Sequence, residues 1–421
     1  MFRNFGFALL LVPSLAAAQG TRAQCAPDNA GLRLPDGFCA QIVADSIGPA
    51  RHITVAPNGD LFVAVRSTNT QRGALVMLRD TNNDGTADVV SRIGALTGSE
   101  AVYHDGYVYF GTDTAIVRYR WSPGGIDRGA SPDTVVMGLR AERGHHAAKS
   151  FAISRDGSIF VNIGAPSNAC EERMNAPGTK GQDPCPFLET SGGIWRFDAK
   201  KLRQSQADGE RWATGIRNIM AITMDPAGRI PWGTQHGRDL LASNWGKTFP
   251  LYTEAKSAEN PGEEMFRLDK GGDFGWPYCY WDVDQKKKVL APEYGGDGVK
   301  PGKCAAVGQP MAAYPGHWAP NGMVFYTANA FPAKYRQGAF IAFHGSWNRA
   351  PLPQAGFNVV YQPFASGRPS GAYEIFADGF RGAANEQQRR PTGLAVASDG
   401  SLLVTDDRAG RVYRIRWVGG R

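Results

Sequence analysis

The stretch Gly144-His-His-Ala-Ala-Lys-Ser-Phe-Ala-Ile-Ser-Arg-Asp-Gly-Ser-Ile-Phe-Val-Asn-Ile-Gly164 decides the fold. In its second half, apolar residues alternate with others on both sides of an Asp156-Gly157 turn. Period-two alternation around Asp-Gly is a strong signal for a β-hairpin. The first half carries two adjacent histidines, His145 and His146, just before the first expected strand. Side chains at the ends of strands are held rigidly and face open space, so we expect chemistry there.

The same hairpin pattern recurs along the chain. Six copies place turn glycines at Gly59, Gly106, Gly157, Gly228, Gly322 and Gly400. Repeats of several short strands at this spacing are typical of propeller blades, and the longer gaps between copies indicate insertions. We therefore predict an all-β fold, a six-bladed β-propeller over residues 25–418 with loop insertions stapled by disulfides. The alternative is a pair of β-sandwiches whose turns are similar by chance.

The N-terminus has the pattern of a secretory signal peptide, which we assign to residues 1–18. A basic Arg3 precedes an apolar run from Phe5 to Leu15, and small residues follow at Ala16-Ala-Ala18. The run is too short to span a bilayer, and no later stretch is long and apolar enough to do so. We expect export to the periplasm or to the medium, without a membrane span.

Cysteine usage agrees with export. The six cysteines all follow the leader and fall as near neighbours in sequence. We predict three disulfides, Cys25–Cys39, Cys170–Cys185 and Cys279–Cys304, because exported chains use such bridges to order loose loops. Zinc is the alternative, but no Cys-x-x-Cys pair is present to hold it.

The formal net charge of +7 is spread along the chain. Apart from the run Lys286-Lys-Lys288, the basic residues form no stripe of the kind that follows a nucleic-acid backbone. We predict no nucleic-acid partner.

An acidic loop at residues 80–88 is a candidate metal site. Asp80, Asn82, Asp84 and Asp88 supply oxygen atoms at alternate positions, and Gly85 permits a sharp turn. The loop lacks the closing Glu of an EF-hand. Both a structural calcium site and a plain acidic turn between strands remain open.

Histidine and arginine recur at the expected strand ends. Arg217 and Asn218 precede their hairpin as His146 precedes its own, and Arg390 precedes the last hairpin. His236 follows the fourth hairpin. A neutral imidazole at such a place can take a proton from a hydroxyl, and guanidinium groups can hold an anionic, planar ligand. One shared central site explains these positions better than coincidence.

Six motifs resemble the soluble quinoprotein glucose and sorbosone dehydrogenases, closest to the sorbosone-dehydrogenase-like branch. They are His146 before Phe151-Ala-Ile-Ser-Arg-Asp-Gly157, Gly215-Ile-Arg217-Asn218, Gln235-His236-Gly237, Gly271-Gly-Asp-Phe-Gly-Trp-Pro277, Phe343-His-Gly-Ser-Trp-Asn-Arg349 and Arg390-Pro-Thr-Gly-Leu394. That family consists of six-bladed propellers that oxidise sugars with pyrroloquinoline quinone. The resemblance implies the same fold, cofactor and substrate class here.

The resemblance also implies roles for individual residues. His146 matches the catalytic base, and Arg217 and Asn218 match groups that contact the quinone, with Arg217 also assigned to catalysis. Arg390 matches an arginine that lines the same site. The backbone carbonyls of Gly237 and Arg238 match those that hold a calcium ion against the cofactor.

The sequence departs from the glucose enzyme at several of these positions. His145 stands in place of an Asp, His236 in place of a Gln, and Thr392 in place of a second Arg. The cofactor-binding lysine has no clear match, although Arg349 is a candidate substitute. These departures put the glucose preference in doubt more than the cofactor.

The resulting hypothesis is an exported oxidoreductase that oxidises an aldose-type sugar or sugar aldehyde. Hydride passes to pyrroloquinoline quinone held with Ca²⁺, and a soluble quinone or cytochrome then accepts the electrons. Two alternatives are a calcium-dependent propeller lactonase and an exported binding propeller without catalysis, because a propeller fold alone does not define function.

Overall fold

A computed structural model gives the structure of the protein and describes Met1 and residues 25–141, 146–382 and 388–419. The predicted leader, apart from Met1, and His145 lie outside these ranges. No helix within the described ranges is both apolar and long enough to cross a membrane.

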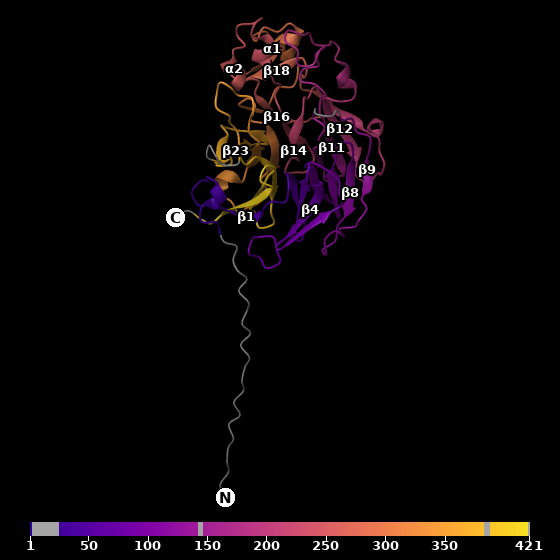
Figure 1. Ribbon diagram of the computed structural model, residues 1–421, viewed down its shortest axis with the longest axis vertical. Helices are drawn as coiled ribbons and strands as arrows, with labels where there is room; N and C mark the ends of the chain where they lie inside the picture. The colour runs from indigo at the N-terminus through magenta and orange to yellow at the C-terminus, as the bar shows by residue number, and fades with distance from the viewer. Residues whose placement is uncertain (2–24, 142–145, 383–387, 420–421) are drawn as a thin grey trace.

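The described residues form six four- or five-stranded sheets, each one blade of a β-propeller (Figure 1). Blade one contains β2 (Ala50–Val55), β3 (Leu61–Val65), β4 (Ala74–Arg79) and β5 (Val89–Ile93). Blade two contains β6 (Glu100–His104), β7 (Tyr107–Gly111), β8 (Ile116–Arg120) and β9 (Asp133–Val136). Blade three contains β10 (Phe151–Ile153), β11 (Ser158–Ile163), β12 (Gly193–Asp198), β13 (Glu210–Thr214) and the parallel β17 (Gly272–Asp273).

The last three blades follow in chain order. Blade four contains β14 (Ile219–Met224), β15 (Pro231–Gln235), β16 (Glu263–Arg267) and β20 (Ala312–Tyr314). Blade five contains β21 (Pro320–Phe325), β22 (Gly338–Phe343), β23 (Asn358–Ala365), β24 (Arg368–Pro369) and β25 (Glu374–Ala377). Blade six contains β26 (Pro391–Val396), β27 (Leu402–Asp406), β28 (Arg411–Trp417) and β1 (Phe38–Ala44).

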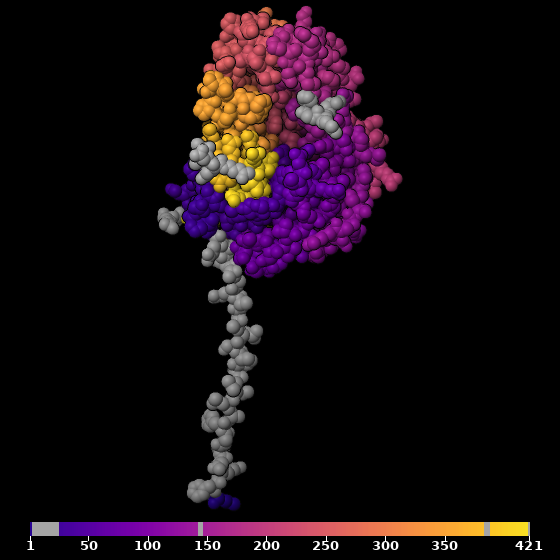
Figure 2. Space-filling model, in the orientation of Figure 1, coloured from indigo at the N-terminus to yellow at the C-terminus, as the bar shows by residue number. Residues whose placement is uncertain are grey.

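The ring closes because an N-terminal strand completes the sheet of the C-terminal blade. The first strand of each blade contacts its neighbours in turn, and β26 of blade six returns to β2 of blade one. The N-terminal strand β1 is the outermost strand of blade six, antiparallel to β28 with Phe38 opposite Trp417. The first and last strands of the propeller, β1 and β28, are therefore paired, and the indigo and yellow parts of the propeller lie next to each other (Figures 1 and 2). The predicted all-β, six-bladed propeller is confirmed.

Both faces of a blade are buried, each against a different neighbouring blade, so alternate residues of one strand pack into different clusters. Along β11, Ile159, Val161 and Ile163 pack toward blade two, whereas Phe160 packs toward blade four. Each apolar face excludes water from one gap between blades, so a one-residue slip would exchange the two faces.

Five of the six predicted turn glycines lie between the first and second strands of a blade. They are Gly59, Gly106, Gly157, Gly228 and Gly400, each with positive φ. The prediction was wrong for Gly322, which lies within β21 opposite Ala342. A Cβ atom there would come within 2.1 Å of the Thr392 carbonyl oxygen, so this glycine permits close packing of blades five and six.

Insertions and short helices extend blades three and four. In these two blades the helices are α1 (Leu241–Trp245) and α2 (Glu254–Glu259), the small hairpin is β18 (Cys279–Asp282) with β19 (Lys287–Leu290), and the 3-10 turns are η2 (Pro186–Glu189), η3 (Gln206–Asp208), η4 (Pro292–Tyr294) and η5 (Gly302–Ala305). Two further 3-10 turns lie elsewhere, η1 (Asn29–Gly31) before β1 and η6 (Ala333–Tyr335) in blade five. α1, α2 and β18 gather at one end of the molecule (Figure 1). All three predicted disulfides are present: Cys25–Cys39, Cys170–Cys185 and Cys279–Cys304.

Candidate active site

The candidate site lies at the face of the propeller where first strands begin and second strands end. Asn218 directly precedes β14 and Arg390 directly precedes β26, while His236 directly follows β15. One predicted equivalence was wrong. Lys149 and Ser150, not His146, directly precede β10, and His146 lies further upstream.

His146 is held in one tautomer by the end of the neighbouring strand. Its Nδ1 lies 2.7 Å from the backbone carbonyl oxygen of Ala165. Because a carbonyl oxygen only accepts, Nδ1 carries the proton and Nε2 keeps its lone pair. Burial and the positive charge of Arg217 lower the pKa of His146 to about 3, so the ring is neutral at ordinary pH.

Close backbone packing permits this arrangement. His146 has a φ of 37°, in the left-handed region that is strained for a residue with a side chain. A Cβ atom at Gly164 would lie 2.5 Å from the Cβ of His146 and 2.9 Å from Oδ1 of Asn218. Glycine at position 164 therefore lets His146 and Asn218 approach the same backbone.

Arg217 is buried, with 7% of its surface exposed, and is tied to the same segment. The Ala165 N–H donates to the Arg217 carbonyl oxygen at 2.8 Å. The Arg217 guanidinium contacts Asn168 Oδ1 at 3.2 Å and Asp239 Oδ2 at 2.9 Å through Nη2. Its Nε is buried and has no hydrogen-bond partner among the described residues. The guanidinium thus keeps a donor that is not used within the protein.

Asp239 is the hub of this network, and the sequence did not single it out. Its Oδ1 accepts from Asn348 Nδ2 at 2.7 Å and lies 3.3 Å from His317 Nδ1. Its backbone N–H donates to Asn168 Oδ1 at 2.8 Å. Burial alone would raise the pKa of Asp239, but Arg217, His317 and Asn348 outweigh burial and lower that pKa well below its usual range. Asp239 is therefore a fixed anion that orients Arg217.

Asn218 and His236 lie on the other side of Arg217. Asn162, the last polar residue on its face of β11, donates from Nδ2 to Asn218 Oδ1 at 2.8 Å. The His236 N–H donates to the Asn218 carbonyl oxygen at 2.9 Å. His236 Nε2 lies 3.0 Å from the Pro320 carbonyl oxygen, which fixes its proton on Nε2. Burial and Arg217 lower the pKa of His236 to about 4.

Arg390 belongs to a second hydrogen-bond network at the same face of the propeller, which we call the mouth of the site. Its Nη1 donates to the Gly345 carbonyl oxygen at 3.0 Å and lies 3.3 Å from His344 Nδ1. His344 Nε2 lies 2.9 Å from Asp407 Oδ1, and Asp407 also pairs with Arg51. An ionised carboxylate only accepts, so Asp407 fixes the proton of His344 on Nε2 and leaves Nδ1 to accept from Arg390.

The Gly237–Arg238 segment, which was predicted to hold calcium, is fixed in position by a hydrogen bond and a buried ion pair. The Gly237 N–H donates to Glu263 Oε2 at 2.7 Å, and Arg238 forms a buried ion pair with Glu293. A Cβ atom at Gly237 would lie 3.0 Å from the Pro261 carbonyl oxygen. Burial raises the pKa of Glu263 to about 7. The Gly262 carbonyl oxygen lies 3.1 Å from the same Cβ position at Gly237. Carbonyl oxygens are among the ligands that Ca²⁺ accepts.

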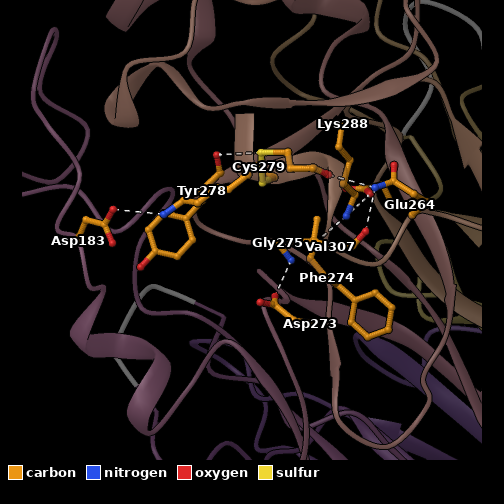
Figure 3. The surroundings of a disulfide bond; sticks show 12 residues. Asp183, Glu264, Asp273, Phe274, Gly275, Tyr278, Cys279, Lys288 and Val307 are labelled. Carbon is orange, nitrogen blue, oxygen red and sulfur yellow. Dashed lines mark hydrogen bonds and ion pairs between the residues drawn. A yellow bond between two sulfur atoms is a disulfide. The ribbon is translucent and has the colours of Figure 1, made fainter. Parts of the chain in front are cut away.

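A buried ion pair between Lys288 and Glu264 holds Gln235, which lies just before the Gly237–Arg238 segment. Gln235 accepts from the Arg217 N–H at 3.1 Å and donates to Glu264 Oε1 at 2.9 Å. Lys288, on the hairpin that begins at Cys279, lies 3.0 Å from Glu264 Oε2 and donates to the Phe274 carbonyl oxygen at 2.5 Å. Figure 3 shows Lys288 pointing to both groups, beside the disulfide. The Cys279–Cys304 insertion is therefore connected to Arg217.

Two predicted positions are not joined to this site. The Arg349 guanidinium donates to the carbonyl oxygens of Ala258 and Gly316 and pairs with Glu259, so its donors are used within the protein. In the 80–88 loop, Asp80 Oδ2 accepts from the Gly85 N–H at 2.7 Å, a contact of an ordinary turn. Across the described ranges, no group of three or more His, Cys, Asp or Glu side chains is arranged to hold a metal.

His344, Asp407, Asn168 and Asp239 were missed as site residues. A simple positional rule could have found two of them, because His344 directly follows β22 and Asp407 directly follows β27, as His236 follows β15. Asp239 and Asn168 lie in loops, and no sequence pattern brings them together.

Comparisons with known proteins identify a family and agree with the fold. The family model described as TrAA12-like matches residues 32–418. The pyrroloquinoline quinone-dependent pyranose dehydrogenase of Coprinopsis cinerea is 24% identical over 441 residues, covering 92% of this chain and 55% of that protein. An aldose sugar dehydrogenase of Escherichia coli is 27% identical over 140 residues, 33% of this chain and 30% of that protein. The chain spans about half the length of the first curated relatives that it matches, 48% and 55%.

Solved structures share the fold. The holo form of the pyranose dehydrogenase PQQ domain from Coprinopsis cinerea has a TM-score of 0.72 at 21% identity, covering 91% of this chain and 97% of that one. A calcium structure of a Trichoderma reesei Carbohydrate-Active Enzymes Family AA12 protein has a TM-score of 0.74 at 18% identity, covering 95% and 99%.

Proposed function

Since the chain belongs to the TrAA12-like family, we propose that it is an oxidoreductase that oxidises a sugar with pyrroloquinoline quinone and Ca²⁺. The observation that carries this proposal is the fixed tautomer of His146 beside Arg217. A neutral imidazole with a free Nε2, next to a buried cation, suits proton removal beside an anionic cofactor.

In this proposal, His146 Nε2 takes the hydroxyl proton of the sugar while the C–H hydride leaves the same carbon. When bound, the quinone would supply the hydride acceptor, and Ca²⁺ would supply a positive charge beside it. A base works best with a pKa near the working pH, and Arg217 contributes to the low pKa of His146. A carboxylated ligand on Arg217 would offset that positive charge, so ligand binding would strengthen the base.

Arg217, Asn218 and Arg390 would hold the carboxylates and oxygens of the quinone, and the carbonyls of Gly237 and Arg238 would hold the calcium ion. Arg217 has a spare donor at Nε, and Arg390 lies with its guanidinium carbon 5.1 Å from the ring centroid of Phe357. Packing on this buried ring holds the Arg390 guanidinium in place, and fixed guanidinium groups suit an anionic ligand.

A lactonase would instead need carboxylates free to bind calcium and water at the mouth. Two carboxylates at the mouth are engaged with cations, Asp239 with Arg217 and Asp407 with Arg51. This favours the dehydrogenase. We also propose export to the periplasm or medium, supported by the three disulfides and the leader pattern, and a soluble quinone or cytochrome as electron acceptor.

Reconstitution tests the proposal. The purified protein, incubated with pyrroloquinoline quinone and Ca²⁺, should acquire bound-cofactor absorbance and reduce an artificial dye with members of an aldose panel. Omission of the quinone should abolish dye reduction, and NAD should not replace it. Failure to bind the quinone, or binding without turnover of any sugar, would reject the proposal.

A further inference from the structure

One large aromatic side chain stands exposed at the mouth of the candidate site. Trp347 lies in the loop between β22 and β23 and is 72% exposed, although tryptophan is usually highly buried. Close sequence neighbours in the same loop are interior residues: Ser346 is 2% exposed and Arg349 is 5% exposed. The loop therefore turns the Trp347 indole outward while Ser346 and Arg349 anchor the loop in the interior.

Hydrogen bonds fix this loop on both sides of Trp347. On one side, Arg390 donates to the Gly345 carbonyl oxygen at 3.0 Å, and Ser346 Oγ accepts from the Ala355 N–H at 2.9 Å. On the other side, Asn348 Nδ2 donates to Asp239 Oδ1 at 2.7 Å. The loop thus bridges the Arg390 network and the Asp239 hub, and Trp347 lies between these two anchors.

A rigid, exposed indole beside a polar site suits one kind of ligand well. Sugars in the pyranose form present hydroxyl groups at the rim and a face of C–H bonds. Such a face packs on an aromatic ring, which buries apolar surface at little cost in entropy because the ring is already held. The polar groups needed for the hydroxyls lie on the same loop and its partners.

We propose that Trp347 is a specificity-determining residue that stacks on the C–H face of a pyranose substrate at the mouth. This inference rests on the proposed function for the identity of the substrate. It assigns Trp347 to the sugar rather than to the quinone or to a protein electron acceptor.

The test compares Trp347→Ala and Trp347→Phe with Val90→Ala, which shortens another exposed apolar side chain on β5, the outer strand of blade one. With the quinone- and calcium-loaded proteins, KM is measured for a hexopyranose and for acyclic glyceraldehyde. Trp347→Ala should raise KM for the hexopyranose about ten-fold, since one aromatic contact is worth roughly a decade in affinity. KM for glyceraldehyde, the cofactor Kd and kcat should stay within about three-fold in this variant, a margin well inside one decade of affinity. Trp347→Phe should retain most of the affinity, and Val90→Ala should match the wild type.

Other results would overturn the inference. An unchanged hexopyranose KM would remove Trp347 from the sugar site, and a parallel rise in cofactor Kd would assign the ring to the quinone. An equal rise for glyceraldehyde would indicate collapse of the loop. Saturation-transfer NMR of the hexopyranose on wild type and Trp347→Ala separates this inference from the proposed function. Binding that needs Trp347 supports the inference even without turnover, and binding that does not, or no binding to the wild type, overturns it.

Discussion

His146 and Arg217 are held by the same residue, Ala165, whose carbonyl oxygen accepts from the His146 ring and whose N–H donates to the Arg217 backbone. The two groups that the proposed reaction needs, a base and a cation, are thereby fixed relative to each other. Ala165 follows β11, and Arg217 comes just before β14. The contact between blades three and four therefore sets the geometry of the site.

The first prediction concerns the proposed base. His146→Gln should lower kcat with sugar by roughly two or more orders of magnitude, as removal of a general base does. Cofactor affinity should stay near the wild-type value, because glutamine keeps a donor for the Ala165 carbonyl. Steady-state kinetics and a cofactor titration measure both. His104→Gln, in β6, is the matched control. Near-normal turnover in the His146 variant would remove His146 from the mechanism.

The second prediction concerns stability against pH. The pKa of folded His146, about 3, lies below the unfolded value near 6.5, so the unfolded chain binds the extra proton between these values. His146 thus stabilises the fold less and less as the pH falls from about 6.5 toward 3. His146→Gln should lose fewer degrees of Tm than the wild type between pH 7 and pH 4. Equal losses in thermal scans would contradict the low pKa.

The third prediction concerns the hub at Asp239. Asp239→Asn removes the charge that holds the Arg217 guanidinium in its orientation. Because Arg217 would then no longer be fixed toward the cofactor, we expect quinone affinity to fall by about ten-fold or more. Asp378→Asn is the control, because its partner Arg33 is 74% exposed and such pairs contribute little. Calorimetric titration of both variants with the quinone provides the comparison. A fall of the same size in both variants would argue against an orienting role for Asp239.

The fourth prediction concerns the ion pair of Lys288 and Glu264. Lys288→Met leaves a carboxylate buried without its cation, which should destabilise the protein by about 3–5 kcal/mol. Because Glu264 holds Gln235 and Gln235 holds the Arg217 backbone, quinone affinity should fall as well.

A double variant separates charge from packing. Lys288→Met with Glu264→Gln removes both charges, so stability and quinone affinity should recover toward the wild type. Urea unfolding and quinone titration of the single and double variants form the cycle. If the double variant is as impaired as Lys288→Met alone, the pair does not act as a charge support for Arg217.

The propeller could be predicted from sequence because each blade repeats a local signal, alternation around a tight glycine turn. Gly322 shows the limit of that signal. Its Asn-Gly pattern equals that of a hairpin turn, yet the glycine serves a contact with Thr392 in another blade. Close packing between two blades and a tight turn can each require glycine, so the sequence alone does not distinguish them.

The site residues also fall into two groups, those that a local sequence pattern predicts and those that it does not. Residues at strand ends, such as Arg217 and Arg390, could be found because the repeat fixes their positions. Asp239 could not, because its partners Asn168 and Asn348 come from different loops that only the folded chain brings together. Arg349 was expected at the cofactor from its motif, but backbone carbonyls that no sequence pattern reveals take up its donors.

The last prediction concerns calcium. In the proposed site, the backbone carbonyls of Gly237 and Arg238 would hold Ca²⁺ next to the bound quinone. Backbone ligands bring no net charge, so calcium affinity without the quinone should be modest. Added quinone should raise it, and linkage requires calcium to raise quinone affinity by the same factor.

Calorimetric titrations with each ligand, in the presence and absence of the other, measure the two factors. Asp84→Asn in the 80–88 loop is the control: that loop is far in sequence from Gly237, and its change should leave the coupling intact. Unequal factors would indicate a second calcium site that acts elsewhere. If calcium binds equally well with and without the quinone, the ion does not share ligands with the cofactor. Calcium-supported hydrolysis of a lactone by the same protein would then favour the lactonase.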